Sequence, residues 1–227
     1  RPPRSTLFPY TTLFRSQLRN EKEVTGFYMS GHPLDDYRLE IEAFCKNTIA
    51  DIREENIKRM LGHQVSVAGI VTSSTERTTK NNTLFGIFVM EDHNDSVQLS
   101  MFSDDYMKFR HLLVQGMSLI VTGSVQKRFR DSDQIELKVS NVSLLAESID
   151  KLTKSVTITL DAFEVNDEMV AMLKEAVSAS RGNTPLYVNV VNETSRISVK
   201  MPSRLRIQAR QLVAMLKNKE GIRLSLS

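Results

Sequence analysis

QVSVAGIV, at residues 64–71, begins a series of five β-rich segments that decides the fold of this chain. The other four are LFGIFVM (84–90), VQLSMF (97–102), MSLIVTGSVQKRF (117–129) and QIELKVSNVSLL (134–145). Their β-branched and large apolar residues, often alternating with polar ones, are typical of half-buried strands. Between the third and fourth segments, SDDYMKFRHLLV (103–114) places Tyr106, Phe109, Leu112 and Leu113 at helical spacing. The pattern predicts five strands with one helix between the third and the fourth.

This order of elements is that of the OB-fold, a small Greek-key barrel that binds oligonucleotides. We therefore predict an OB-fold nucleic-acid-binding domain over residues 64–147. Beyond it, SVTITL (155–160), LYVNVV (186–191), RISVKM (196–201) and IRLSLS (222–227) indicate further strands. Helical spacing marks Met169, Met172, Leu173 and Ala176, and again Leu212, Met215 and Leu216. The β-α-β-β-α-β order predicts a small α+β domain of the ferredoxin-like, split βαβ type over residues 148–227.

A short helical bridge is predicted before the barrel, over residues 17–63. Leu34, Tyr37, Ile41 and Phe44 form one apolar stripe at helical spacing behind Pro33. Residues 1–16, RPPRSTLFPYTTLFRS, differ from the rest, because prolines interrupt any regular element and TLF occurs twice. We interpret them as translated sequencing adapter, the alternative being a disordered native tail, and exclude them from the fold prediction.

Bulk composition restricts the class of protein. Hydrophobic residues make up 41% of the chain and charged residues 25%, as is ordinary for a globular protein. The sequence contains no apolar run of the roughly 18 residues that a membrane span needs, and no signal peptide is apparent. The single cysteine, Cys45, excludes an internal disulfide and fits a reducing cytoplasm, where we expect the protein to act. The net charge of +3 is too small to indicate nucleic-acid binding by itself.

No catalytic or metal site is predicted. Asp35 and Asp36 are neighbours in the first turn of a helix, where acids favour the helix dipole, and they point about 100° apart. Asp104 and Asp105 repeat this arrangement, and EDHND (91–95) lacks the glycine and closing glutamate of a calcium loop. The four histidines have no cysteine or histidine partner at ligand spacing, and no phosphate-binding glycine loop or GxSxG motif is present. We expect no cofactor in this chain.

Two inter-strand loops carry the candidate nucleic-acid-binding residues. The first loop holds Arg77, Lys80 and Asn82, and the loop between strands four and five holds Lys127, Arg128, Phe129 and Arg130. In OB-folds these two loops and the faces of strands two and three form the binding groove. Cations can bind phosphates and an aromatic ring can stack a base. The alternative is that the basic residues only solubilise exposed loops; the predicted fold favours binding.

GFYMSGHPLDDY, at residues 26–37, closely resembles a segment of the alpha subunit of bacterial DNA polymerase III. In that family the segment joins the helix-hairpin-helix region to the OB domain. VSVAGIVTS (65–73), TTKNNTLFGIFVMED (78–92), VQLSMFSDDYMKF (97–109) and LIVTGSVQKR (119–128) are similar to the family's OB domain, in order. GNTPLYVNV (182–190), RISVKM (196–201) and GIRLSLS (221–227) resemble its last domain more loosely.

The resemblance implies a function in DNA replication. It implies that the OB domain binds single-stranded template and that residues 148–227 dock the tau subunit of the clamp loader. The catalytic domain of such a DNA-directed DNA polymerase, with its Mg2+, and the contacts with other replisome subunits would lie in regions absent from this chain. Two alternatives stay open: the anticodon-binding OB domain of an aminoacyl-tRNA synthetase, and the error-prone paralogue of the polymerase.

Overall fold

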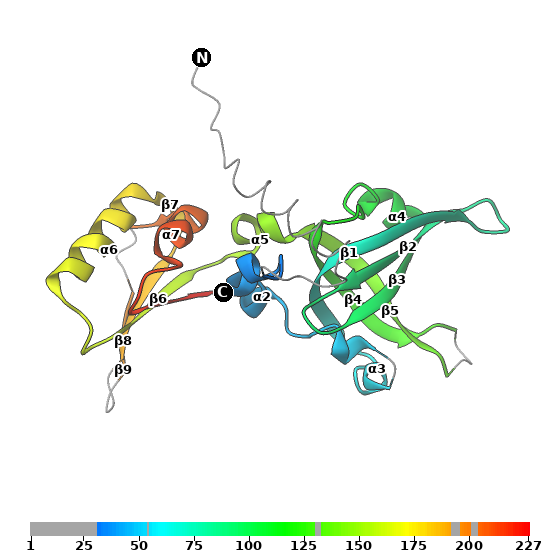
Figure 1. Ribbon diagram of the computed structural model, residues 1–227, viewed down its shortest axis with the longest axis horizontal. Coiled ribbons are helices and arrows are strands. Elements are labelled where there is room, and N and C mark those ends of the chain that lie inside the picture. The colour runs from blue at the N-terminus through cyan, green and yellow to red at the C-terminus, as the bar shows by residue number, and fades with distance from the viewer. Residues whose placement is uncertain (1–30, 54, 130–132, 192–195, 201–203) are drawn as a thin grey trace, which may run out of the picture. The chain divides into compact units, whose positions relative to one another are not determined.

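The structure, a computed structural model, describes residues 31–53, 55–129, 133–191, 196–200 and 204–227. The expectations for residues 1–16 and 17–30 therefore lie outside the described residues. The chain divides into two compact units (Figure 1). Of the described residues, the first contains 31–38 and those of Asn47–Leu144. The second contains Leu145–Ser227 and the short segment Leu39–Lys46.

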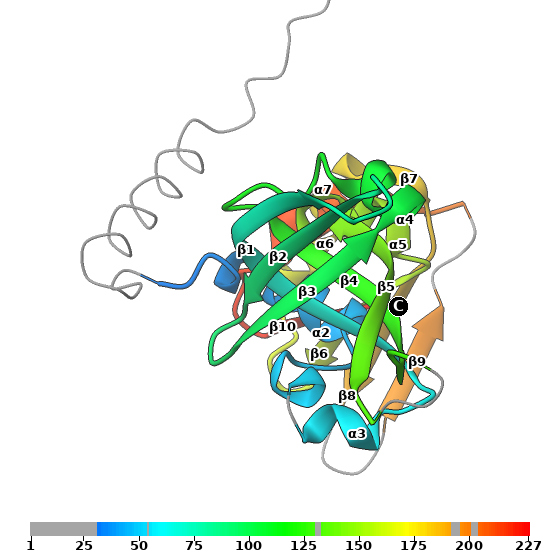
Figure 2. The same cartoon turned by 90° about the vertical axis from the view of Figure 1, so that its right-hand side faces the viewer.

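Five antiparallel strands form the sheet of the first unit: β1 (Gln64–Thr78), β2 (Leu84–Glu91), β3 (Ser96–Phe102), β4 (Ser118–Lys127) and β5 (Ile135–Leu144). Their order in the sheet is β3-β2-β1-β4-β5, and β3 also contacts β5, which closes the barrel (Figure 2). Helix α4 (Ser103–Phe109) connects β3 to β4. The predicted OB-fold, with its helix between the third and fourth strands, is confirmed.

Strand β1 is the central strand of the sheet and pairs with both β4 and β2. Its first half pairs with β4 from Gln64 to Ile70, and its second half pairs with β2 from Ile70 to Thr78. A register shift between Val71 and Ser73 marks a bulge where the strand changes partner, and bulges bend strands in this way. The alternating positions that face inward, such as Phe88 and Met90 on β2, are fully buried in the barrel core.

The segment before the barrel is helical, as predicted, but it consists of short pieces. They are the 3-10 turn η1 (Asp35–Tyr37), helix α2 (Arg38–Phe44), the 3-10 turn η2 (Ala50–Ile52) and helix α3 (Asn56–Arg59). Asp35 and Asp36 lie in the first turn of η1, as expected. Ile49, Ile52 and Ile57 join the barrel core, whereas Leu39, Ala43 and Phe44 of α2 pack against the core of the second unit.

The second unit is an α+β structure with its own four-stranded sheet. The strands are β6 (Val156–Asp161), β8 (Leu186–Val191), β9 (Arg196–Lys200) and β10 (Ile222–Leu226), in the order β10-β6-β8-β9. Helices α5 (Leu145–Leu152), α6 (Asp167–Ala179) and α7 (Ala209–Leu216) and the short strand β7 (Arg181–Thr184) complete it. Alternating residues Val156, Ile158 and Leu160 of β6 are buried in a core shared with Leu212 and Leu216 of α7.

The predicted β-α-β-β-α-β order is confirmed for the four strands of this sheet and helices α6 and α7, with the short strand β7 added between α6 and β8, but the split βαβ pairing is not. In a split unit another strand separates the two parallel strands. Here β6 and β8 pair directly in parallel, from Val156 with Leu186 to Asp161 with Val191. Strand β9 then pairs antiparallel with β8 at one edge, and β10 pairs antiparallel with β6 at the other. The order of elements along the chain leaves this choice open, because both arrangements use the same strands and helices.

Candidate nucleic-acid interface

The β1–β2 hairpin places three of the predicted binding residues at the surface. Arg77 lies near the end of β1, and Lys80 and Asn82 lie in the loop that follows; all three are exposed. The loop is closed by the Thr79 amide, which donates to the Thr83 carbonyl over 2.9 Å. Asn82 has a φ of 60°, a left-handed conformation that asparagine tolerates well, so its first role is to shape the turn. Within the described part of the chain, neither Arg77 nor Lys80 is held in an ion pair.

The β4–β5 hairpin carries the second predicted group. Lys127 is exposed at the end of β4. The Arg128 guanidinium lies 3.8 Å from Glu136 Oε2 and 5.8 Å from the centroid of the Phe129 ring, so part of its charge is already balanced. Phe129 is 68% exposed. Arg130 lies outside the described residues.

The two hairpins do not form one cluster. Figure 1 shows them projecting from the barrel as separate loops. No hydrogen bond or ion pair joins them among the residues that the structure describes. A ligand that touches both groups of predicted residues would therefore have to be extended, as a single-stranded nucleic acid is.

The outer face of β1, β2 and β3 contains two aromatic residues that were not predicted. Arg77 is the register partner of Phe85, and Phe85 is the register partner of Phe102. Directly opposite residues on antiparallel strands point to the same face, so these three side chains form one row across the sheet. The Phe85 and Phe102 rings are stacked, with centroids 5.3 Å apart and planes inclined by 17°.

The next two rows of this outer face are uncharged, and Glu91 follows at the far end of β2. These two rows are Thr75, Ile87 and Ser100, and then Ser73, Val89 and Gln98. Arg77 is thus the single charge at these nine positions. The sequence contained a signal for this face, because Phe85, Ile87 and Val89 alternate with the buried Gly86, Phe88 and Met90. The pairing of Phe85 with Phe102 could not be predicted, because it depends on the register between two strands.

Helix α4 supports the hairpin from the opposite side. A Cβ atom on Gly86 would lie 2.2 Å from a carbon of the Tyr106 ring, so only glycine lets that ring pack against β2. The Tyr106 hydroxyl donates to Glu76 Oε2 over 2.9 Å, and Arg110 lies 3.8 Å from the same oxygen. Burial, and then the hydrogen bond to Glu76, raise the pKa of Tyr106. Glu76, the neighbour of Arg77 in the sequence, therefore makes its contacts on the opposite face of β1.

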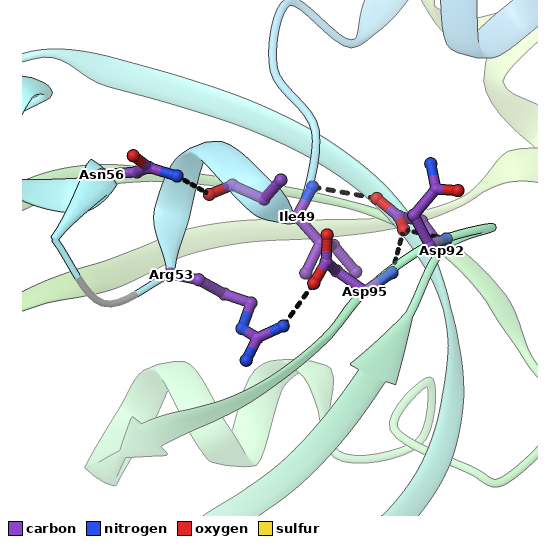
Figure 3. A network of polar contacts seen from close by, with 7 residues as sticks. Ile49, Arg53, Asn56, Asp92 and Asp95 are labelled. Atoms are coloured by element: carbon purple, nitrogen blue, oxygen red, sulfur yellow. Dashed lines mark hydrogen bonds and ion pairs between the residues drawn. The ribbon is translucent and has the colours of Figure 1, made fainter.

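The acidic side chains of the β2–β3 turn form hydrogen bonds and an ion pair within the first unit. Asp92 Oδ2 accepts a hydrogen bond from the Ile49 amide over 3.0 Å, and Asp95 pairs with Arg53 (Figure 3). Asp92 Oδ1 also accepts from the Asn94 and Asp95 amides, each over 2.9 Å. EDHND is thus a turn between strands, as predicted. Within the described ranges, no group of three or more His, Cys, Asp or Glu residues could hold a metal ion.

The His93 ring connects this turn to Asp35. Its Nε2 lies 2.8 Å from Asp35 Oδ1, and its ring centroid lies 4.2 Å from that of His32. The hydrogen bond with His93 is the largest cause that lowers the pKa of Asp35. Together with the contacts of Asp92 and Asp95, it holds the segment before the barrel against one end of β2 and β3.

The second unit offers a different kind of surface. Arg210 is bound by Asp150 over 2.8 Å and by the Ala146 carbonyl, and Arg206 donates to the Asn183 carbonyl over 3.2 Å. A groove of about 520 Å³ runs along α6 and the adjoining face of β6 and β8. Its lining is apolar except for Lys174 and Ser178. This surface is therefore suited to apolar side chains rather than to a phosphate backbone.

Comparison with known proteins identifies the two regions separately. A family described as OB-fold nucleic acid binding domain matches residues 65–145. A family described as DNA polymerase III alpha subunit, C-terminal domain, matches residues 156–227. In solved structures the chain is similar to the Saccharomyces cerevisiae mitochondrial single-stranded DNA binding protein Rim1, at 18% identity and a TM-score of 0.31, over 37% of this chain and 96% of that one. It is likewise similar to the OBody AM1L10, at 18% identity and a TM-score of 0.34, over 44% and 92%.

Curated relatives extend the match across both units. The DNA polymerase III subunit alpha of Escherichia coli O157:H7 is 25% identical over 84% of this chain and 16% of its own length. The Pseudomonas fluorescens protein of the same name is 22% identical over 91% of this chain and 17% of its own length. The chain thus spans about a sixth of the length of these relatives. No helix in the described part is long and apolar enough to cross a membrane. The OB-fold match is followed along the chain by the match to the last domain of the alpha subunit, and these relatives cover both. The chain therefore corresponds to the C-terminal region of DNA polymerase III alpha subunits.

Proposed function

We propose that this chain is the DNA-binding and partner-docking part of a replicative DNA polymerase III alpha subunit, which works in the bacterial cytoplasm. Its OB unit binds single-stranded template, and its second unit docks the tau subunit of the clamp loader. The nucleotidyl transfer, and the Mg2+ that it uses, belong to regions of the alpha subunit outside this chain. The family match and the length of the curated relatives support this division.

One observation supports single-strand binding most strongly. On the outer face of β1–β3, two uncharged rows end in the row of Arg77, Phe85 and Phe102, beside a hairpin whose Lys80 is also exposed. Cations bind phosphates of any sequence, and aromatic rings stack any base, so the interface should be tolerant of sequence. Lys127 and Arg128 on the other hairpin extend the positive surface along the strand.

The salt dependence of DNA binding tests this proposal. A fluorescently labelled oligothymidylate is titrated with the 227-residue chain at several KCl concentrations, and anisotropy gives Kd. If about four phosphates are contacted, the slope of log K against log salt should be roughly −3, from about −0.7 per phosphate on single strands. Absence of binding at low salt, or affinity independent of salt, would contradict single-strand binding. Primer extension by the purified chain with Mg2+ would contradict the absence of a catalytic centre.

The apolar groove of the second unit supports protein docking. Apolar grooves beside a helix accept the apolar face of a partner segment. Phe163, at the start of the β6–α6 connection, is 81% exposed, and Val165 and Leu205 at the groove are also exposed. The basic side chains Arg206 and Arg210 are bound within the unit, which disfavours a phosphate-binding role for them.

Both alternative functions are less well supported. The match of residues 156–227 to the last domain of the alpha subunit, together with the curated relatives, disfavours a synthetase anticodon-binding domain. The same match favours the replicative polymerase over its error-prone paralogue.

A further inference from the structure

Two aromatic features of the OB unit could stack a base. One is Phe129 on the β4–β5 hairpin, and the other is the stacked pair of Phe85 and Phe102 on the sheet. Phe129 has its own Arg128 as its ring contact, at 5.8 Å, and no second ring lies against it among the described residues. A side chain held this loosely loses conformational entropy when a ligand fixes it, which reduces its contribution to affinity.

The Phe85–Phe102 pair is held in place before any ligand binds. The two residues are partners in the β2–β3 ladder, and their rings stack at 5.3 Å. The Tyr106 ring packs closely against Gly86, the neighbour of Phe85, on the opposite face of β2. One face of the Phe102 ring is turned to Phe85, yet the side chain remains 45% exposed. The free surface of Phe102 is therefore a rigid, open aromatic platform.

We propose that Phe102, backed by Phe85, is the base-stacking position of this OB unit, in place of Phe129. The inference rests on the proposed single-strand binding and assigns it a specific contact. Arg77 lies in the same row, two strand spacings of about 4.8 Å from Phe102, and supplies a cation for a nearby phosphate. No base-specific hydrogen bond is needed, so any base is accepted.

Abasic DNA separates stacking from phosphate binding. Two oligothymidylates of equal length and charge are compared on the whole chain, one complete and one with abasic sites throughout its centre. The wild type binds the complete strand more tightly. Phe102→Leu keeps the apolar packing against Phe85 but removes the aromatic face, so affinity for the complete strand falls roughly tenfold. Affinity for the abasic strand and the salt slope stay unchanged, because no phosphate contact is lost.

Phe129→Leu is the matched control, with an expected change of less than twofold for either strand. Melting temperatures of both variants equal to wild type exclude unfolding as the cause. A tenfold loss from Phe129→Leu with none from Phe102→Leu overturns the assignment. So does a Phe102→Leu variant that weakens both strands equally. If the wild type binds neither strand, the proposed single-strand binding itself is wrong, and the stacking position fails with it; wild-type binding without discrimination against the abasic strand refutes only the stacking.

Discussion

The Tyr106 hydroxyl donates a hydrogen bond to Glu76 Oε2 over 2.9 Å and so connects helix α4 to strand β1, two elements that are separated by β2 and β3 in the sequence. Tyr106 is buried, and its ring occupies the space that a side chain on Gly86 would need. The contact fixes the strands whose outer faces carry Arg77 and Phe85. The stability of the candidate interface therefore depends on a residue that does not belong to it.

Tyr106→Phe should lower the free energy of unfolding of the OB unit by about 1 kcal/mol at neutral pH, because one partly buried hydrogen bond is lost. The pKa of Tyr106 is higher in the folded state than in the unfolded state, where it lies near 10.0. The stabilisation that the Tyr106 hydroxyl contributes is therefore complete below about pH 10. It is lost as the pH rises from there toward the folded-state pKa. Calorimetry at pH 7.5 and above pH 10 should therefore show a difference between wild type and variant that shrinks at the higher pH. Equal melting temperatures at pH 7.5 would refute the contribution of this bond.

Asp92 should be the most sensitive residue of the β2–β3 turn. Asp92→Ala leaves three backbone amides, those of Ile49, Asn94 and Asp95, without their acceptor and should cost about 2 kcal/mol. Asp104→Ala, in the exposed first turn of α4, removes only a helix-dipole interaction and should cost about 0.5 kcal/mol. Thermal unfolding of the two variants provides the comparison. If they melt at the same temperature, the network in Figure 3 does not hold the segment before the barrel.

Reversing the charges of the β4–β5 hairpin should weaken single-strand binding. Lys127, Arg128 and Arg130 changed together to Glu should lower affinity and make the salt slope shallower, because fewer phosphates are neutralised. The matched control reverses Lys154, Lys217 and Lys219 in the second unit and should leave the slope near the wild-type value. A hairpin variant that binds as tightly as wild type, with the same slope, would exclude this hairpin from the interface.

Tau binding should depend on the apolar groove. Leu205→Glu places a charge in the lining and should weaken tau binding in a pull-down or by surface plasmon resonance at least tenfold. Met215→Glu changes an exposed apolar residue of α7 outside the lining and should have little effect. Affinity for single-stranded DNA should be unchanged in both variants. Equal losses in both would show that the groove is not the docking site.

The strands of the barrel could be predicted from the sequence because their alternation reflects which side chains face the core. LFGIFVM (84–90) predicts both β2 and its outer face, since Phe85 and Ile87 alternate with the buried Phe88 and Met90. The stack of Phe85 on Phe102 could not be predicted, because a shift of one residue in register would separate the rings. The direct pairing of β6 with β8 was missed for a related reason: it is decided by packing between distant segments, not by local pattern.

The roles of the charged residues were predictable only in part. Arg77 and Lys80 are exposed, as expected for loop cations, whereas Arg128 is partly balanced by Glu136, which lies eight positions further on the adjoining strand. Charge along a sequence does not reveal such pairings, because they form only when the hairpin closes.

Mapping the bound strand tests the central claim most directly. Hydrogen–deuterium exchange of the whole chain, read by mass spectrometry with and without saturating oligothymidylate, locates the contact surface peptide by peptide. We predict slower exchange in peptides covering 73–87 and 98–102, with a smaller effect at 127–129, and no change over 204–216. Slower exchange confined to residues 148–227, with the β1–β3 peptides unaffected, would contradict single-strand binding by the OB unit.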